Sequence, residues 1–468
     1  MMAIDTGELS RQNERLRRIL AISHELGGTL ELESLLPGII AHVTDVMEAD
    51  RSTLFLHDPK TATLWTIVAQ GLDTNEIRIP VGAGICGHVA ERRERLNIAD
   101  AYDCAYFDQS FDRKTGYRTR SVLCMPLDDR QGGLLGVIQV LNKKDGGIFT
   151  DDDESFLSTL SVQIAMLLEN ANLYRKIEHT FENVVAAIAR AIDSRDPVTA
   201  GHSRRVAQFT INLARGVHEC TEGPFADVRF SRAQMRCLRY AALLHDFGKV
   251  GVPESILQKG ERLEPNIIQV VSSRLHAATL QSQLDRLRGL AAGENDFDTT
   301  AAFLAKVNRL GFLNDEDAAR LKTIYDEGLI TPAEYHALSI RKGTLTPEER
   351  AVMEAHVQKT LTVLSAIEWP DDMKDLPIIA ASHHEAEDGS GYPQGLKGDQ
   401  IPLGGRCMAV ADVYDALTAQ DRPYKPAIPH DKSCAILRDM AAHGKLHPAL
   451  VELFITKELY RLRDGDGV

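Results

Sequence analysis

The chain has 468 residues, more than one hydrophobic core usually supports, so we expect two or three domains. Its composition, 44% hydrophobic and 26% charged, is typical of a globular protein, and no stretch approaches the roughly 18 consecutive apolar residues of a membrane-spanning helix. The formal net charge of −14 argues against a role in coating DNA or RNA, because phosphate polymers require a basic surface.

The N-terminal segment and the cysteines both indicate a cytoplasmic protein. Residues 1–18 are polar and charged and lack the apolar stretch of a secretory signal. The seven cysteines are odd in number and spread thinly, which does not fit a disulfide framework. We therefore expect a protein of the reducing cytoplasm that does not enter a membrane.

Residues 1–155 are predicted to form an α+β domain with an antiparallel sheet and flanking helices. Residues 10–50 have helical spacing, and four later stretches have the composition of strands: 53–56, 64–68, 121–126 and 134–141. Glycine-rich turns separate these stretches, as hairpins require. The length and the pattern fit a sensor-sized domain.

Residues 156–195 are predicted to form a long linker helix. Its apolar residues step by threes and fours, interrupted by Glu178, and include Leu157, Leu160, Ile164, Leu167, Ala171, Tyr174, Phe181, Val185, Ile188 and Ile192. This spacing is close to a coiled-coil seam. One interpretation is a helix packed on its own domain; the other, which we favour, is a parallel coiled coil that makes a homodimer. Asp196-Pro197 ends the run.

Residues 196–468 are predicted to be all-helical, with an insertion at about 260–341. The segment 259–265 resembles the segment 342–347, and the residues between them look like an addition to a smaller fold. A lid, a partner surface and a dimer contact are all compatible with such an insertion. We expect His276 and His336, which lie inside it, at the surface.

Two adjacent pairs, His245-Asp246 and His383-His384, are the main candidates for chemistry. An imidazole beside a carboxylate can bind one divalent ion and let the carboxylate bridge to a second. A buried tandem histidine pair needs partners for four ring nitrogens, which makes a purely structural role costly. Each pair alone is only suggestive.

The order of the pairs relative to three further residues is more specific. His202, His356 and Asp412 are singly unremarkable, but in chain order with the two pairs and the run Asp388-Gly389-Ser390-Gly391-Tyr392-Pro393 they make a pattern. This pattern resembles the HD-GYP family of the HD phosphohydrolases. The resemblance implies an all-α domain that hydrolyses cyclic di-GMP to the linear dinucleotide or to GMP.

The resemblance also implies roles for individual residues. One metal ion would be held by His202, His245, Asp246 and Asp412, and Asp246 would bridge to a second ion held by His356, His383 and His384. Lys249 would contact the phosphate as a catalytic and substrate-binding residue, and Arg422 and Lys425 would bind the other phosphate. Gly391, Tyr392 and Pro393 would shape the pocket, and Asp415 would orient the attacking water.

The sequence departs from the family in ways that affect the metal count. Family members with three metals carry a glutamate four residues before the first histidine, but Val198 stands there and cannot ligate. We therefore predict two ions. A mixed histidine and carboxylate set favours iron or manganese, and zinc is also compatible.

The N-terminal domain resembles the GAF sensor domains. Asn142, Lys143, Phe149, Asp153 and Glu154 match the signature of cyclic-nucleotide-binding GAF domains, in which the lysine and the aspartate form an ion pair that holds the fold. Three interpretations stay open: a cyclic nucleotide, another small molecule, or no ligand.

The combined prediction is a metal-dependent cyclic di-GMP phosphodiesterase regulated by a GAF domain. Two alternatives remain: a hydrolase of another nucleotide, cyclic or not, and a receptor that binds cyclic di-GMP without cleaving it.

Overall fold

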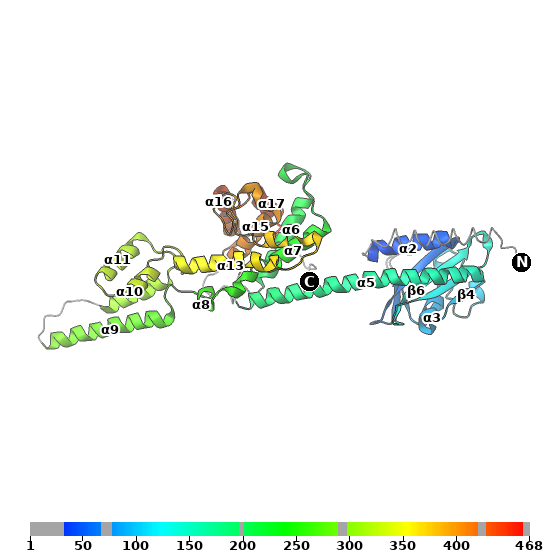
Figure 1. The fold of residues 1–468 in the computed structure, drawn as a ribbon, viewed down its shortest axis with the longest axis horizontal. Helices are drawn as coiled ribbons and strands as arrows, with labels where there is room; N and C mark the ends of the chain where they lie inside the picture. The colour runs from blue at the N-terminus through cyan, green and yellow to red at the C-terminus, as the bar shows by residue number, and fades with distance from the viewer. Residues whose placement is uncertain (1–31, 67–76, 196–200, 289–296, 420–426, 462–468) are drawn as a thin grey trace. The chain divides into compact units, whose positions relative to one another are not determined.

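The computed structural model describes residues 32–66, 77–195, 201–288, 297–419 and 427–461 (Figure 1). The chain divides into two compact units, Met1–Phe181 and Glu182–Val468. Within the described ranges, no helix combines the length and the apolar character needed to cross a membrane.

The first unit is built on one antiparallel sheet of six strands in the order β3-β2-β1-β6-β5-β4. The strands are β1 (Ala49–Asp58), β2 (Thr63–Thr66), β3 (Ile77–Pro80), β4 (Leu96–Ile98), β5 (Val122–Asp128) and β6 (Leu134–Lys143). The helices are α2 (Leu32–Val46), α3 (Gly84–Arg92), α4 (Ser110–Thr115) and α5 (Asp151–Asp193), of which the part up to Phe181 belongs to this unit, with short 3-10 turns η1 (Ala101–Asp103) and η2 (Lys144–Gly146). All four predicted strand regions overlap observed strands, and the predicted α+β fold is confirmed.

The sheet is covered on both faces. In the pairing of β1 with β6, Leu54 lies opposite Ile138 and Phe55 opposite Val137. Leu54 and Ile138 belong to a core shared with α2 and α5, whereas Phe55 and Val137 belong to a second core with α3 on the other face. This alternation is the period of two expected of a strand buried on both sides. Gly136 is required in this pairing, because a Cβ there would lie 2.1 Å from the carbonyl oxygen of Phe55.

Helix α5 contributes one of its faces to the core of the first unit. The buried residues are Phe156, Leu157, Leu160, Ile164, Ala165, Leu168 and Ala171, so the first part of the predicted coiled-coil seam packs on the helix's own domain. The core therefore extends past residue 155, where the sequence placed the end of the domain. A different row of apolar side chains on α5 is exposed: Val162, Met166, Leu173, Ile177 and Val184.

The second unit is all-helical, as predicted. Its elements before the insertion are α6 (His202–His218), η3 (Gly223–Phe225), α7 (Arg232–Leu244), η4 (Phe247–Gly251) and α8 (Glu254–Leu257). Those after it are α13 (Pro347–Ser365), η5 (Asp371–Met373), α14 (Leu376–Ala380), η6 (Gly398–Gln400), α15 (Leu403–Thr418), α16 (His430–Ala442) and α17 (Pro448–Thr456). Helices α7 and α13 both begin with a capping box, at Ser231 and Thr346, in which side chain and backbone satisfy each other's hydrogen bonds.

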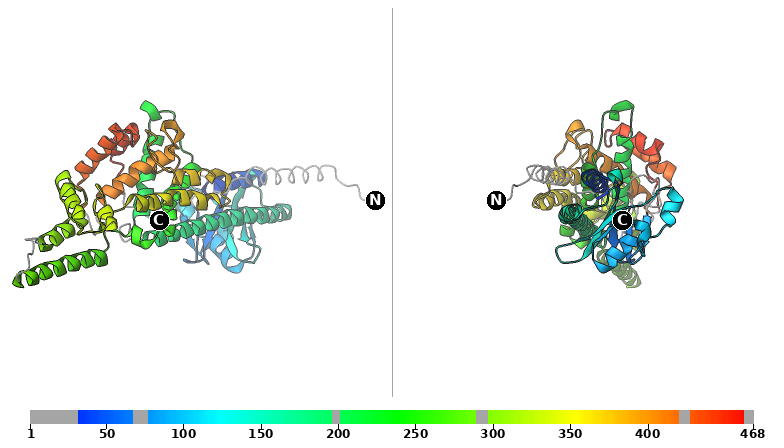
Figure 2. Two further views of the ribbon diagram at one scale, coloured as in Figure 1. Left: turned by 60° about the vertical axis from the view of Figure 1, so that its left-hand side comes forward. Right: turned by 90° about the vertical axis from the view of Figure 1, so that its right-hand side faces the viewer.

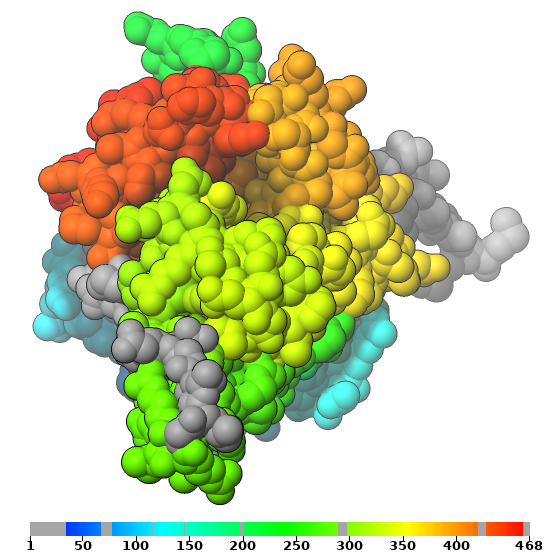
Figure 3. Space-filling model, turned by 90° about the vertical axis from the view of Figure 1, so that its left-hand side faces the viewer, coloured from blue at the N-terminus to red at the C-terminus, as the bar shows by residue number. Residues whose placement is uncertain are grey.

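The predicted insertion forms helices with a core of their own. They are α9 (Pro265–Leu287), α10 (Phe297–Arg309), α11 (Asp315–Asp326) and α12 (Pro332–Leu338), bright green to yellow-green in Figures 2 and 3. Leu304, Val307 and Leu338 are among the buried residues of this core. His276 and His336 are exposed, as expected. The predicted loop at 289–296 lies outside the described residues.

Candidate metal centre

Seven side chains predicted as metal ligands come together in the second unit from five separate segments. They are His202 at the start of α6, His245 and Asp246 at the turn from α7 to η4, His356 on α13, His383 and His384 after α14, and Asp412 on α15. Five of the seven are buried, among them His245 at 1% exposure and His356 at 2%. So many polar side chains gathered away from water need a partner that satisfies them.

The first group consists of His202, His245 and Asp412. Their ligand atoms all lie within 4.8 Å of one another. Nε2 of His202 lies 3.2 Å from Oδ1 of Asp412, and Nε2 of His245 lies 4.0 Å from the same oxygen. Two imidazole nitrogens and one carboxylate oxygen directed at a common point are ligands typical of a divalent transition metal.

The second group consists of His356, His383 and His384, again with ligand atoms within 4.8 Å of one another. Asp246 lies between the two groups. Its Oδ2 is 3.3 Å from Nε2 of His245, and its Oδ1 is 3.2 Å from Nε2 of His356. The two oxygens thus face histidines of different groups, which is the arrangement of a bridging carboxylate.

The histidines present one defined ring nitrogen to the site. Nδ1 of His245, His356 and His383 donates a hydrogen bond to the carbonyl oxygen three residues earlier, at 2.8, 2.5 and 2.7 Å. This bond fixes the tautomer and leaves Nε2 as the free lone pair. Nε2 of both His356 and His383 is buried and makes no hydrogen bond with the residues that the structure describes. Buried unpaired lone pairs of this kind fit a metal ion.

The electrostatics of the site keep His383, His384 and Asp246 in their metal-binding forms. At His202, burial alone would lower the pKa, but hydrogen bonds with Asp412 and Asp415 raise it to about 10, so that metal binding there would displace a proton. Burial lowers the pKa of His384 to about 4 and that of His383 well below its ordinary value, so both rings are neutral at pH 7. Burial alone would raise the pKa of Asp246, but the nearby His245 and Lys249 outweigh it and hold that pKa well below its usual range. Neutral imidazoles and an ionised carboxylate are the species that bind metals.

Thr360 on α13 joins the two halves of the site, a contact that sequence reasoning missed. Its hydroxyl accepts a hydrogen bond from the amide of Gly248 at 2.8 Å and donates one to the carbonyl oxygen of His245 at 3.1 Å. Gly248 permits this approach, because a Cβ there would lie 1.8 Å from the carbonyl oxygen of His356. The only sequence signal was the glycine after the His-Asp pair.

The predicted pocket loop lies beside the second group. The amide of Tyr392 donates to the carbonyl oxygen of His384 at 3.1 Å, and the two rings are 4.8 Å apart between centroids. Glu385 holds the loop by accepting hydrogen bonds from the amides of Gln394 and Leu396 at 2.8 and 2.9 Å. Gly391 must be glycine, since an added Cβ would lie 2.5 Å from the carbonyl oxygen of His384. Pro393 follows Tyr392 in the same loop.

Lys249 lies at the edge of the bridging carboxylate, with its Nζ 2.7 Å from Oδ2 of Asp246. The Lys249 ammonium therefore lies beside the point where the two ligand groups meet. Arg422 and Lys425, predicted at the other phosphate, and Val198, on which the predicted metal count rests, lie outside the described residues.

Asp415 has contacts that differ from the role expected from the sequence. Its Oδ2 lies 2.8 Å from Nδ1 of His202, and Arg205 donates to both of its oxygens. With both oxygens engaged and 2% exposure, the carboxylate is directed at a ligand and not at the open site. Arg205 was missed by sequence reasoning, although it lies three residues after His202 on the same helix face.

The GAF-like signature residues form the expected network. Lys143 Nζ lies 3.1 Å from Oδ1 of Asp153, and both side chains are largely buried. Asn142 accepts from the amide of Arg120 at 2.7 Å, and Phe149 lies under the Lys143 ammonium at 5.9 Å. Glu154 pairs with Arg95. These contacts tie β6 to the start of α5 and stabilise the fold.

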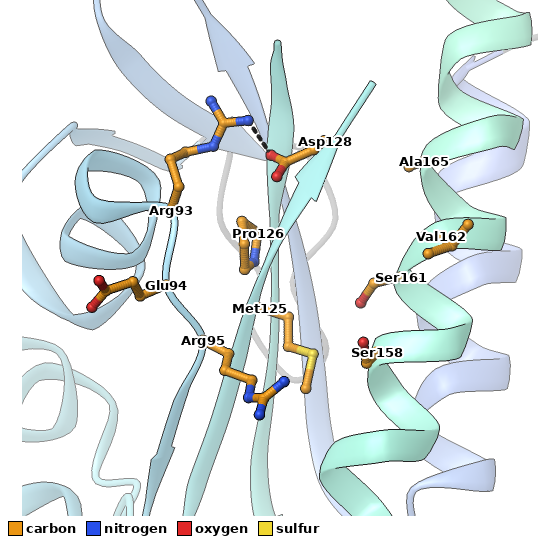
Figure 4. Close-up of a pocket in the computed structure, with 10 residues that line it drawn as sticks. All are labelled: Arg93, Glu94, Arg95, Met125, Pro126, Asp128, Ser158, Ser161, Val162 and Ala165. Carbon is orange, nitrogen blue, oxygen red and sulfur yellow. Dashed lines mark hydrogen bonds and ion pairs between the residues drawn. The ribbon is translucent and has the colours of Figure 1, made fainter. Parts of the chain in front are cut away.

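A cavity of about 460 Å³ in the first unit lies against α5 (Figure 4). Met125 and Pro126 of β5 lie between the segment of Arg93–Arg95 and the helix, from which Ser158 and Ser161 point toward the cavity. Arg93 is held by Asp128 at its rim. A small molecule bound here would touch the linker helix directly.

Comparison with known proteins agrees with this division. A model of the GAF domain matches residues 31–168, and two models of the HD domain match residues 199–305 and 267–450. The chain contains a GAF domain followed by an HD domain. The HD domain thus carries all seven predicted ligands.

The relatives in the comparison are larger proteins. The dual 3',5'-cyclic-AMP and -GMP phosphodiesterase 11A of Takifugu rubripes is 35% identical over 178 residues, 36% of this chain and 20% of that protein. The dual phosphodiesterase 11 of Drosophila melanogaster is 30% identical over 250 residues, 48% of this chain and 17% of that protein. The chain therefore spans only a small part of either relative.

Among solved structures, the GAF domain of a phosphoenolpyruvate-protein phosphotransferase from Coxiella burnetii is 24% identical. The match covers 35% of this chain and 96% of that one, with a TM-score of 0.32.

Proposed function

We propose that the HD domain is a metal-dependent phosphodiesterase and that its substrate is cyclic di-GMP, which it cleaves to the linear dinucleotide or to GMP. The observation that carries this proposal is the position of Asp246, whose two oxygens face the histidines of two ligand groups in one buried site. A site of this kind would hold two cations, which together can activate a water molecule for attack on a phosphodiester.

The proposed cofactor is a pair of iron or manganese ions. His202, His245, Asp246 and Asp412 would hold one, and Asp246, His356, His383 and His384 the other. When bound, two such ions activate a water molecule and neutralise the phosphodiester. The mixture of imidazole and carboxylate ligands favours these metals over magnesium, which prefers an all-oxygen shell.

The surrounding residues bind and orient the substrate. Lys249 places its ammonium beside Asp246, where it can contact a phosphate oxygen. The Gly391-Tyr392-Pro393 loop, fixed by Glu385, presents an aromatic ring beside His384 on which a guanine base can stack. Arg422 and Lys425 are proposed to bind the second phosphate of the dinucleotide.

The test is hydrolysis by the anaerobically purified full chain, with metal content and product measured on the same sample. We expect about two ions per chain and turnover of cyclic di-GMP. His245→Ala and Asp246→Ala should abolish turnover, whereas His276→Ala, at an exposed histidine of the insertion, should match wild type. Equal turnover in the first two variants would refute the assignment, and binding of cyclic di-GMP without turnover would favour a receptor.

A second candidate substrate is a 3',5'-cyclic mononucleotide, because both named relatives are dual cyclic-AMP and -GMP phosphodiesterases. The two candidates separate in a competition experiment. Preferential cleavage of cyclic AMP or cyclic GMP over cyclic di-GMP at equal concentration would replace the first proposal by the second. The same experiment, extended to other nucleotides, tests an HD phosphohydrolase of broader specificity.

We further propose that the GAF domain regulates turnover through α5. Helix α5 begins in the core of the GAF domain and ends at Asp193, whose Oδ1 accepts a hydrogen bond of 2.6 Å from the hydroxyl of Ser203. Ser203 directly follows the ligand His202, so the end of the linker contacts the neighbour of a metal ligand. A cyclic nucleotide or another small molecule is the proposed GAF ligand.

Coupling is tested by the ratio of turnover with and without saturating cyclic AMP or cyclic GMP at the GAF domain. Ser203→Ala should move this ratio toward one. Ser194→Ala removes only a hydrogen bond within the linker, to the carbonyl oxygen of Ala191, and should leave the ratio unchanged. A ratio of one in the wild-type chain, with binding of the nucleotide shown independently, would contradict the coupling.

A further inference from the structure

The ligand His202 occupies a weakly held position in the backbone. It is the first residue of α6, and the preceding Gly201 has a φ of +70° and provides no side-chain cap. A residue at a helix N-terminus has no helical turn before it to restrain it. The direction of its ring must therefore be fixed by contacts of the side chain.

Those contacts come from Asp415 on α15. Nδ1 of His202 donates to Oδ2 of Asp415 at 2.8 Å, which directs Nε2 toward Oδ1 of Asp412 at 3.2 Å. Asp412 and Asp415 are one helical turn apart, so α15 supplies both the metal-binding carboxylate and the one that orients the ring. A carboxylate behind a ligating histidine fixes its tautomer and its rotation.

Arg205 in turn fixes Asp415. Nε of Arg205 lies 2.6 Å from Oδ1, and Nη2 lies 3.0 Å from Oδ2, which is a two-point contact with the flat carboxylate. A carboxylate with 2% exposure is costly unless a cation pairs with it. A guanidinium fork allows only one orientation of its partner, whereas a lysine ammonium leaves the carboxylate free to rotate.

We infer that Arg205 is a positioning residue for the metal group of His202, acting through Asp415. The inference rests on the proposed function, because it assumes that this group binds a metal ion. Arg205 is not one of the seven candidate ligands, so we expect it to act through Asp415. We expect its effect on one of the two ligand groups, because its contacts with Asp415 lead to His202, which belongs to the first group.

The experiment measures binding of Mn²⁺ to the full chain, by stoichiometry and affinity. Arg205→Ala should weaken the binding of one of the two ions by about 10- to 100-fold and leave the affinity for the other unchanged. Arg205→Lys keeps the charge but not the two-point contact of the guanidinium. Its affinity for that ion should lie between those of Arg205→Ala and wild type. Arg204→Ala, at the exposed neighbouring arginine, should bind both ions as wild type does.

A merely structural role predicts a different pattern. If Arg205 only supported the fold, Arg205→Ala would weaken both ions together and lower the unfolding temperature of the metal-free chain, and that result overturns the inference. Two ions bound with wild-type affinity would overturn it as well. If Arg205→Ala does not fold, the Mn²⁺ affinities of Arg205→Lys and Asp415→Asn decide. Weaker binding of one ion alone supports the inference, and any other pattern rejects it.

Turnover separates this inference from the proposed function. We expect saturating Mn²⁺ to restore most of the kcat of Arg205→Ala, because its catalytic groups are intact. A wild-type chain that binds two ions but cleaves no cyclic nucleotide would refute the proposed function and leave the metal-binding result to decide the role of Arg205.

Discussion

Oδ1 of Asp246 lies 3.2 Å from Nε2 of His356, while Oδ2 of the same carboxylate lies 3.3 Å from Nε2 of His245. These two histidines come from helices separated by the whole insertion. The carboxylate therefore faces a histidine of each ligand group with a different oxygen, and the consequences of changing it follow directly.

Asp246→Asn should weaken the binding of both metal ions, because an amide offers one oxygen and no charge where the carboxylate offers two oxygens and a negative charge. We expect turnover to fall by more than about 100-fold, a larger loss than for residues that only orient ligands. Metal content and turnover measured together check this. Loss of a single ion with the other intact would show that Asp246 does not bridge.

Thr360→Val keeps the shape of the side chain but removes both of its hydrogen bonds, to Gly248 and His245. The fully buried amide of Gly248 then lacks a partner, which should cost about 1–3 kcal/mol in the free energy of unfolding. We also expect weaker metal binding, since the His245 turn loses its support. Thr362→Val, whose hydroxyl bonds only to the carbonyl oxygen of Gln358 on its own helix, is the matched control.

Removing one partner of the Lys143–Asp153 ion pair should destabilise the GAF domain by about 1.5–3 kcal/mol, because the pair is largely buried. Lys143→Ala is compared with Lys144→Ala, at the exposed neighbouring lysine. Urea unfolding followed by Trp65 fluorescence in a Trp369→Phe background reports on the GAF domain alone, because the chain has two tryptophans. Equal midpoints for the two lysine variants would contradict the expectation.

The same pair gives a pH dependence. Burial alone would raise the pKa of Asp153, but hydrogen bonds from Thr150 and Lys143 outweigh it, and the pKa in the folded protein lies below the ordinary value of 3.8. Its stabilisation is therefore complete above pH 3.8 and is lost as the pH falls through the lower folded value. Below pH 3.8, the free energy of unfolding should fall more steeply with decreasing pH for wild type than for Asp153→Asn.

The exposed row on α5 is where we expect two copies of the chain to meet. Its members are separated by four and seven residues in turn, an eleven-residue repeat that keeps one face of a nearly straight helix apolar. Leu173→Glu combined with Ile177→Glu should convert a dimer into single chains of 51.7 kDa in sedimentation experiments. Lys176→Glu, between them, should not. A wild-type chain that sediments as a monomer would rule the dimer out.

The fold class and the seven ligand candidates could be predicted from the sequence, because each depends on a local pattern or on motif order. The strands follow from alternating apolar residues, and His245-Asp246 and His383-His384 follow from adjacency. The roles of Arg205 and Thr360 could not be predicted, since they depend on which helices pack together. Asp415 shows the same limit, because its distance from His202 is set by the packing of α6 on α15 and not by sequence separation.

The packing of α5 has a consequence for the exchange of sensor domains between proteins during evolution. Leu157, Leu160, Ile164 and Ala171 fill the core under the sheet, so a fragment cut at residue 155 would leave that core open to water. A recombination event that moves this sensor intact to another output domain must carry the helix at least as far as Ala171. The receiving protein then inherits the beginning of the linker together with its register, and only the residues beyond that point are free to adapt to a new partner.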